Sequence, residues 1–228
     1  MTKIKFSGFG ITDMRGKLNG TVASKNRAGA YLRTKVTPVN PNTAAQQQSR
    51  AFLTSLSQAW RGLTQAQRDA WNAAVGDFAK TDIFGDLREP TGKNLYTLLN
   101  INLANTGNAQ ISVPPNPAAV PGIMAGTVTI SVGTPTYTVA YNGAGAAVDI
   151  LVWATSGQSA GKSFVKSEYR LIGTFAGSAA SPYNFEAAYL AKFGAPPVGS
   201  KVFVGLQSVN ATTGQAGIMS SEYAIVVA

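Results

Sequence analysis

Polar and apolar residues follow two different periods along the 228-residue chain, and the change comes near residue 108. Between residues 52 and 78, large apolar residues recur at spacings of three or four, which predicts two helices. A further stripe of leucines predicts a third helix over residues 94–104. Beyond residue 108, Val, Ile, Thr, Tyr and Trp collect in short runs separated by Gly, Pro, Asn and Ser. The pattern therefore predicts an α+β chain with its helices first.

A β-hairpin is expected at residues 17–37, ahead of the helices. Val22 and its neighbours form the first predicted strand, residues 26–29 supply the turn, and residues 31–36 form the return strand. Proline has no amide hydrogen to donate to a sheet, so Pro38 and Pro41 are expected to end the return strand.

The first two helices have clear start signals. Thr43 with Gln46, and Thr64 with Gln67, each fit the capping box, in which the threonine and glutamine side chains satisfy backbone amides at a helix start. The apolar stripes are expected to pack against each other as a helical hairpin hinged at Gly62 and Leu63. The stripes consist of Phe52, Leu56 and Trp60 on the first helix, and Trp71, Val75 and Phe78 on the second.

The second half of the chain reads as an all-β domain. Short strands are expected at residues 125–132, 136–142, 146–154, 163–175, 200–209 and 217–227, and a short helix at 185–192. Such a series of short strands in about 115 residues is typical of an immunoglobulin-like sandwich. The predicted division is a basic hairpin and helical docking domain at 1–108, a proline-rich linker at 109–123 and an immunoglobulin-like β-sandwich at 124–228.

Positive charge is concentrated at the N-terminal end. Residues 1–95 hold 14 of the 19 lysines and arginines and 6 of the 10 carboxylates, so they carry most of the net charge of +9. Three explanations are open: a solvated sheet edge, contact with a partner's carboxylates, or contact with phosphates. The candidate partner-binding residues are Arg15, Lys17, Lys25, Arg27, Tyr31, Arg33 and Lys35.

Residues for catalysis or metal binding are scarce. Cysteine and histidine are absent, which excludes thiolate and imidazole chemistry and zinc sites of the Cys/His kind. Residues 156–163 end in Gly-Lys-Ser, but the first glycine of a phosphate-binding loop is replaced by Ser156, and a strand is expected to follow in place of a helix. Asp82 and Asp86 flank Gly85 as in an ordinary polar turn. We therefore expect a non-enzymatic protein without metal or cofactor.

Five segments together resemble a family of uncharacterised structural proteins of tailed bacteriophages and prophages. These segments are residues 15–22, 31–43, 48–52, 57–64 and 67–72. The resemblance implies a virion component, made in the host bacterial cytoplasm, that binds capsid, portal, neck or tail subunits. It implies a head-decorating or head-to-tail connecting protein, present as a homo-oligomer or in many copies.

Two other functions are open. The basic hairpin of the first 40 residues is also suited to the phosphate backbone of a nucleic acid. Alternatively, the chain is a tail protein whose sandwich binds glycans through Trp153 and Tyr169. No membrane association is expected, because no apolar run approaches the roughly 18 to 20 residues that span a bilayer.

Overall fold

The computed structural model describes residues 2–4, 14–27, 29–37, 39–143 and 145–228. The chain is a mixed α+β protein, as the sequence predicted, and it divides into two compact units. The first unit comprises Met1–Ala51 and Lys80–Arg88, and the second unit comprises Phe52–Ala79 and Glu89–Ala228. These units differ from the domains expected from the sequence, because the second unit combines most of the helical residues with the C-terminal strands, and the boundary between the units falls within the first helix, Ala44–Gly62.

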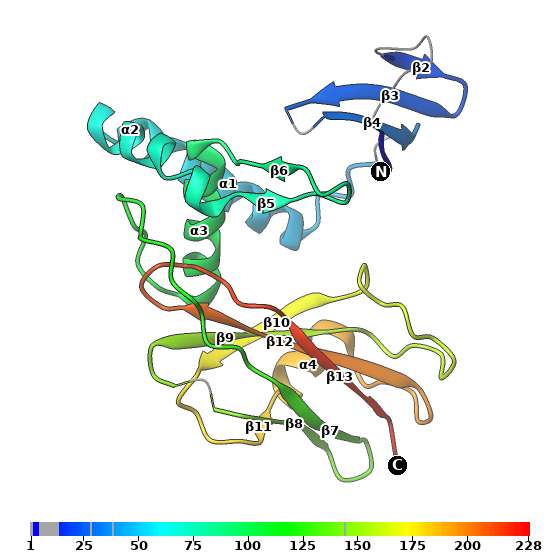
Figure 1. Cartoon of the computed structure of the whole chain (residues 1–228). Coiled ribbons are helices and arrows are strands. Elements are labelled where there is room, and N and C mark those ends of the chain that lie inside the picture. The colour runs from blue at the N-terminus through cyan, green and yellow to red at the C-terminus, as the bar shows by residue number, and fades with distance from the viewer. Residues whose placement is uncertain (1, 5–13, 28, 38, 144) are drawn as a thin grey trace. The chain divides into compact units, whose positions relative to one another are not determined.

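The first unit contains a four-stranded antiparallel sheet with the order β1-β4-β3-β2 (Figure 1). Its strands are β1 (Thr2–Ile4), β2 (Gly16–Leu18), β3 (Thr21–Asn26) and β4 (Gly29–Thr34). The predicted hairpin is confirmed as the β3–β4 pair, although Ala28 of its turn and the expected strand breaker Pro38 lie outside the described residues. A second hairpin, which the sequence did not predict, pairs β5 (Lys80–Thr81) with β6 (Leu87–Arg88).

The three predicted helices are present, but the second ends at Ala73, shortly before Gly76, which is a poor helix former. Val75 and Phe78 of its expected apolar stripe therefore lie beyond it, Phe78 in a 3₁₀ turn. Among the described residues, no helix is long and apolar enough to cross a membrane. The bounds are α1 (Ala44–Gly62), α2 (Gln65–Ala73), the 3₁₀ turn η1 (Gly76–Phe78), α3 (Gly92–Thr106) and α4 (Glu186–Phe193). At the start of α2, Thr64 and Gln67 form the complete predicted capping box. At α1 the box is half formed: Gln46 N donates to Thr43 Oγ1 over 3.4 Å, but the buried Gln46 Oε1 has no hydrogen-bond partner among the described residues.

Replacing Thr64 with alanine is expected to lower the free energy of unfolding by about 1 kcal/mol, because the amide of Gln67 then loses its acceptor. Thr43→Ala should lower the free energy of unfolding by less, because the reciprocal bond of its capping box is missing among the described residues. Urea denaturation followed by circular dichroism measures both. Equal losses at the two caps would contradict the assignment of a complete box to α2 alone.

The helical part of the second unit packs around α3. The sequence led us to expect the stripes of α1 and α2 to pack directly against each other. Instead Tyr96 of α3 contacts both: its ring centroid lies 5.4 Å from that of Trp60 and 5.4 Å from that of Trp71. Leu56, Leu95 and Leu99 complete this buried cluster. The expected helical hairpin is therefore joined through a third helix, which the periodicity of the first two could not indicate.

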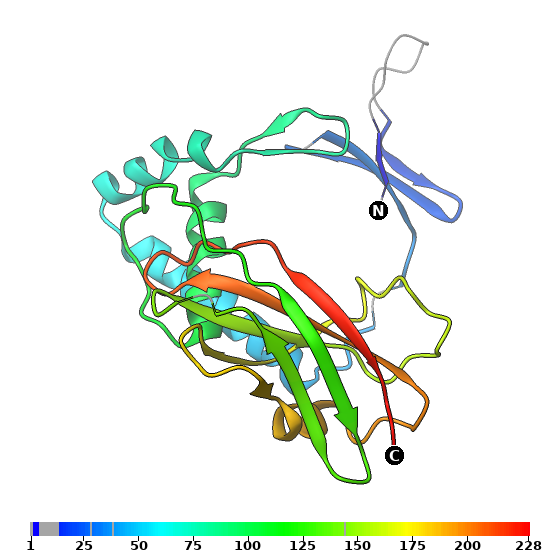
Figure 2. The same cartoon turned by 60° about the horizontal axis from the view of Figure 1, so that its bottom comes forward.

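The strands of the second unit form two antiparallel sheets that face each other (Figures 1 and 2). One sheet has the order β10-β9-β12-β13 and the other has the order β11-β8-β7. Alternate residues of β9, such as Ile150 and Val152, point into a core shared with Ile130 and Val139 of the opposite sheet. The strands are β7 (Ala125–Ser131), β8 (Thr136–Tyr141), β9 (Val148–Ala154), β10 (Arg170–Ala176), β11 (Tyr183–Asn184), β12 (Lys201–Asn210) and β13 (Ser220–Ile225).

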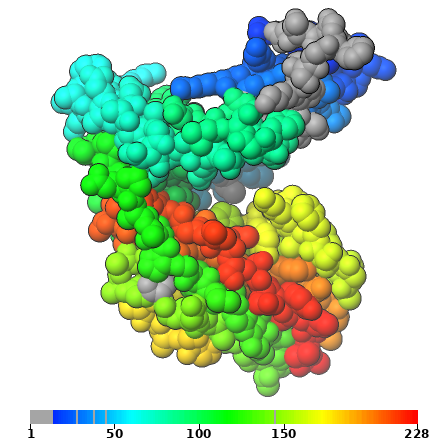
Figure 3. Space-filling view, in the orientation of Figure 1, coloured from blue at the N-terminus to red at the C-terminus, as the bar shows by residue number. Residues whose placement is uncertain are grey.

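The C-terminal residues close one side of this pair of sheets. Beyond β13, Val227 forms a parallel bridge with Ser131, and its amide donates to Ile130 O over 3.1 Å. Figure 3 shows this C-terminal stretch, in red, lying against the green strand β7. The residues after β13 thus satisfy backbone groups at the end of β7 that an open sheet edge would leave unpaired.

Helix α3 and the proline-rich segment are both bound to the sheets. Asn102 Nδ2 donates to Gly214 O over 2.8 Å, in the turn between β12 and β13. Gln215 is bonded to two backbone groups of the proline-rich segment, the carbonyl of Asn116 and the amide of Ala118. The segment that we expected to act as a linker is therefore hydrogen-bonded to the strands that follow it, and the boundary expected near residue 108 falls inside one compact unit.

Tyr189 of α4 makes the stability of the core sensitive to high pH. Its ring is fully buried and its hydroxyl donates to Thr155 O over 3.1 Å. Burial, and next the neighbouring Tyr137, raise its pKa above the ordinary value of 10.0. Above pH 10 the folded chain therefore keeps the Tyr189 proton, whereas the unfolded chain releases it. The contribution of Tyr189 to the free energy of unfolding is complete below pH 10 and is lost as the pH rises further. Tyr189→Phe should flatten the fall of the unfolding free energy above pH 10 in urea titrations; an unchanged slope would contradict this.

Candidate partner-binding site

The strand register decides which of the predicted basic residues lie together. Lys17 of β2 is paired with Val22 of β3, and Val22 is paired with Arg33 of β4. Paired residues point to the same face of a sheet, so Lys17 and Arg33 flank Val22 in one row. Tyr31 lies two residues from Arg33 along β4 and is on the same face. The sheet thus brings together Lys17, Arg33 and Tyr31.

The other four predicted residues do not join this row. Lys25 is paired with Ala30 and lies on the opposite face of the sheet. Arg27 is in the turn between β3 and β4, and Arg15 precedes β2. Lys35 follows β4, where its amide donates to Gly20 O over 2.7 Å. All four side chains are exposed, so the predicted set surrounds the sheet and does not form a single cluster.

The first unit carries almost the whole net charge of the chain. Its sequence contains eleven lysines and arginines and three aspartates, a net charge of +8, whereas the second unit has eight basic and seven acidic residues. Within the described residues, no ion pair involves Lys17, Lys25 or Arg33. A surface of this kind attracts an anionic partner and repels a second copy of itself.

The described residues of the first unit form very little apolar core. Among its described residues, the buried apolar side chains are those of Ala23 and Ala30. Apolar side chains that normally fill a core are instead exposed to solvent: Leu18, Val36, Val39, Ile83, Phe84 and Leu87. A single sheet layer needs a second layer against which to bury its apolar groups. The described part of this unit therefore leaves large apolar side chains without a second layer against which to pack.

Sequence reasoning missed the β5–β6 hairpin as part of this site. It interpreted Asp82 and Asp86 as a polar turn, and so gave no attention to Ile83 and Phe84 between them. The sequence did contain a signal, because Ile83 and Phe84 are large apolar residues within a segment of Asp and Gly that otherwise reads as a polar turn.

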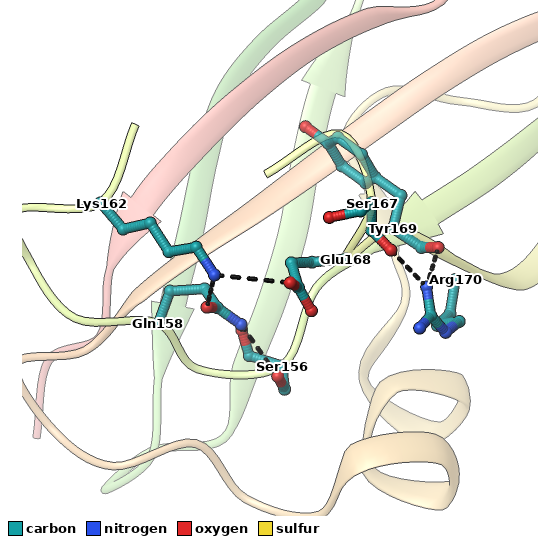
Figure 4. Close-up of polar contacts among 7 residues, drawn as sticks. All are labelled: Ser156, Gln158, Lys162, Ser167, Glu168, Tyr169 and Arg170. Carbon is teal, nitrogen blue, oxygen red and sulfur yellow. Dashed lines mark hydrogen bonds and ion pairs between the residues drawn. The ribbon is translucent and has the colours of Figure 1, made fainter. Parts of the chain in front are cut away.

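The Gly-Lys-Ser sequence of the second unit does not form a phosphate-binding loop. Lys162 Nζ donates to Gln158 Oε1 over 2.8 Å and lies 3.6 Å from Glu168 Oε1, so its charge is used within the loop (Figure 4). No helix follows Ser163, as expected. The predicted strand at 163–175 begins only at Arg170, because residues 162–169 are a loop that this contact holds together.

The structure gives little support to the glycan-binding alternative. Trp153 and Tyr169 are both half-buried. Trp153 Nε1 is buried without a hydrogen-bond partner within the described part of the chain, so it is not presented to solvent as a donor.

Metal binding has no candidate residues in the part of the chain that the structure describes, where no three His, Cys, Asp or Glu side chains gather. Comparison with protein-family models, with curated proteins and with solved structures finds no match to this chain. The basic, poorly buried first unit is therefore the feature on which a function can be argued.

Proposed function

We propose that the chain is a non-enzymatic structural component of a bacteriophage virion, in a head-decorating or head-to-tail connecting position, which acts through contacts with other virion proteins. The resemblance of residues 14–75 to phage structural proteins suggests the setting. The two units suggest a division of labour, in which the first unit binds capsid, portal, neck or tail subunits and the second unit is the self-contained body of the protein.

One observation carries this proposal. The described residues of the first unit bury only two alanines as apolar core, yet they expose six large apolar side chains. Burying an aliphatic or aromatic side chain contributes about 1.5–3 kcal/mol, so a partner that covers even three of the six gains several kcal/mol. An enzyme or a small-molecule binding protein has no need of such an uncovered unit, whereas an assembly protein uses it as an interface.

The test is to purify particles from cells whose genome encodes the chain. Mass spectrometry should detect the chain at a fixed ratio to the major capsid protein. Hydrogen exchange at β3 and β4 should be slower in the particle than in the isolated chain, because the sheet is then covered. Particles that lack the chain would overturn the proposal.

Nucleic-acid binding is the second candidate, because Lys17, Lys25 and Arg33 have no ion-pair partner within the described residues. Phosphate contacts release counterions, so the affinity for duplex DNA would fall steeply between about 50 and 200 mM salt. Lys17→Gln with Arg33→Gln should then reduce the salt dependence, whereas Arg61→Gln with Lys192→Gln in the second unit should leave it unchanged. Absence of binding at low salt would exclude this candidate.

We further propose that the two sheets of the second unit form an immunoglobulin-like sandwich. Strand order supports this, since counting from β7 the first, second and fifth strands make one sheet, and the third, fourth, sixth and seventh make the other. The parallel bridge between Val227 and Ser131 closes the two sheets at one corner. An experimental structure of the whole chain with a different strand order would contradict this assignment.

A further inference from the structure

The β5–β6 hairpin is built around one buried carboxylate. Asp82, whose side chain is 2% exposed, accepts hydrogen bonds at Oδ1 from the amides of Phe84 and Asp86 over 2.8 and 3.2 Å. Its Oδ2 accepts a bond from Arg88 Nε over 3.2 Å. The Asp82 amide in turn donates to Asp86 O over 2.9 Å. Gly85 has a φ of +80°, a conformation that most other residues adopt only with strain. The turn is therefore fixed by its own polar groups.

This rigid turn exposes apolar side chains to solvent. Ile83 is 76% exposed and Phe84 is 46% exposed, and Leu87 follows on β6 with 65% of its surface exposed. A flexible loop would lose conformational freedom on binding, whereas a turn already fixed by Asp82 loses little. An aromatic side chain held in this way is typical of the residues that dominate binding energy at protein interfaces.

The base of the hairpin adjoins the basic sheet of the same unit. A Cβ placed on Gly29, at the start of β4, would lie 3.6 Å from a guanidinium nitrogen of Arg88. The apolar turn therefore belongs to the same compact unit as the cations of the sheet, and its base lies next to the start of β4.

We infer that the β5–β6 hairpin is a docking finger that inserts Ile83 and Phe84 into an apolar pocket of a protein partner, and that carboxylates around that pocket meet the cations of the sheet. The inference rests on the proposed function and gives the chemistry of the partner. Charge complementarity selects an acidic partner, because the first unit carries a net charge of +8.

A protein suits this surface better than a nucleic acid does. The hairpin itself is neutral, since Lys80 and Arg88 balance Asp82 and Asp86. Arg88 is already engaged by both aspartates, with its NH2 nitrogen 3.6 Å from Asp86 Oδ2. A finger that enters a DNA groove would need cations beside its tip, where this one has carboxylates. The aliphatic side chains of Ile83 and Leu87 also offer no ring on which a base can stack.

The experiment places the photo-crosslinking residue p-benzoylphenylalanine at position 84 of the full chain, expressed from its native genome. The matched control places it at position 164, because Phe164 is 77% exposed on the second unit. We expect a discrete protein adduct at position 84 alone, on a partner peptide that combines apolar residues with Asp or Glu. No adduct at 84, the same adducts at both positions, or an adduct with nucleic acid would overturn the inference.

Substitutions then test the finger against the crosslinked partner in purified form. Ile83→Asp is expected to weaken binding by at least about tenfold, because it removes an apolar anchor and adds a charge that the partner repels. Ile218→Asp is the matched control, since Ile218 is 88% exposed on the second unit, and it should leave the affinity unchanged. Urea denaturation should show equal stability for both variants, because neither side chain is buried. Equal affinities for the two variants would overturn the inference.

The particle analysis separates this inference from the proposed function. If the chain crosslinks through position 84 to an acidic protein but is absent from particles, the docking finger is supported and the virion role is contradicted. If the chain is present in particles but forms no adduct at position 84, the virion role is supported and the docking finger is contradicted.

Discussion

Gly214→Ala is expected to lower the free energy of unfolding by about 3–5 kcal/mol, the largest effect of an alanine substitution among the glycines that the structure describes. Gly214 lies in the turn between β12 and β13 with a φ of +70°. An added Cβ would overlap the backbone carbonyl of Leu99 and lie 3.1 Å from the side chain of Leu103. Both belong to α3, so the methyl group would push this helix away from the sheet. Urea denaturation followed by tryptophan fluorescence measures the loss.

Gly199→Ala is the matched control. Gly199 has a similar φ of +80°, but no heavy atom lies within 4 Å of its added Cβ. It should therefore cost only the strain of a left-handed backbone, about 1–2 kcal/mol. Both variants change the unfolded chain in the same way, so the difference between them measures the collision with α3. Equal losses would mean that α3 does not press on this turn.

The contact between Gly214 and α3 shows why the sequence predicted individual strands better than it predicted how helices and sheets pack together. Short runs of Val, Ile, Thr, Tyr and Trp placed β7, β8, β9 and β12 within a few residues of their observed bounds, because these residues pack well in strands that are buried against a shared core. Nothing in the periodicity of α3 shows that its second face rests on a turn at Gly214, 112 residues after Asn102. The prolines of residues 114–121 indicated a linker, but Gln215 binds the backbone of that segment, and such a bond leaves no local pattern.

The candidate site could be predicted in composition but not in geometry. A count of charges found the basic N-terminal end, and the first unit does carry nearly all of the net charge. Which cations share a face depends on strand register: it joins Lys17 with Arg33 and separates Lys25 from them. The β5–β6 hairpin was missed because strands of two residues are too short to alternate. The role of Asp82 depends on side-chain bonds that composition cannot indicate.

Trp71→Ala is expected to lower the free energy of unfolding by about 3–5 kcal/mol, as large aromatic truncations in cores do. Trp71 is fully buried, packs edge-on against Tyr96 and donates from Nε1 to Ser112 O over 2.9 Å. Trp60→Ala is the control, because Trp60 contacts the same ring but is only half-buried. Trp60→Ala should lower the free energy of unfolding by less than Trp71→Ala does, and urea denaturation of both variants measures the difference. A loss for Trp60→Ala as large as that for Trp71→Ala would contradict the central position of Trp71.

The Trp71→Ala variant also decides where the cooperative boundary lies. Helix α3 packs on Trp71 through Tyr96 and on the turn after β12 through Leu99 and Leu103. If these contacts join helices and sheets into one folding unit, hydrogen exchange should quicken together at Leu99 of α3 and at Val204 of β12. If the boundary lies near residue 108, exchange at Leu99 should quicken while exchange at Val204 stays unchanged. We expect the first result, because α3 is buried by residues from both sides of that boundary.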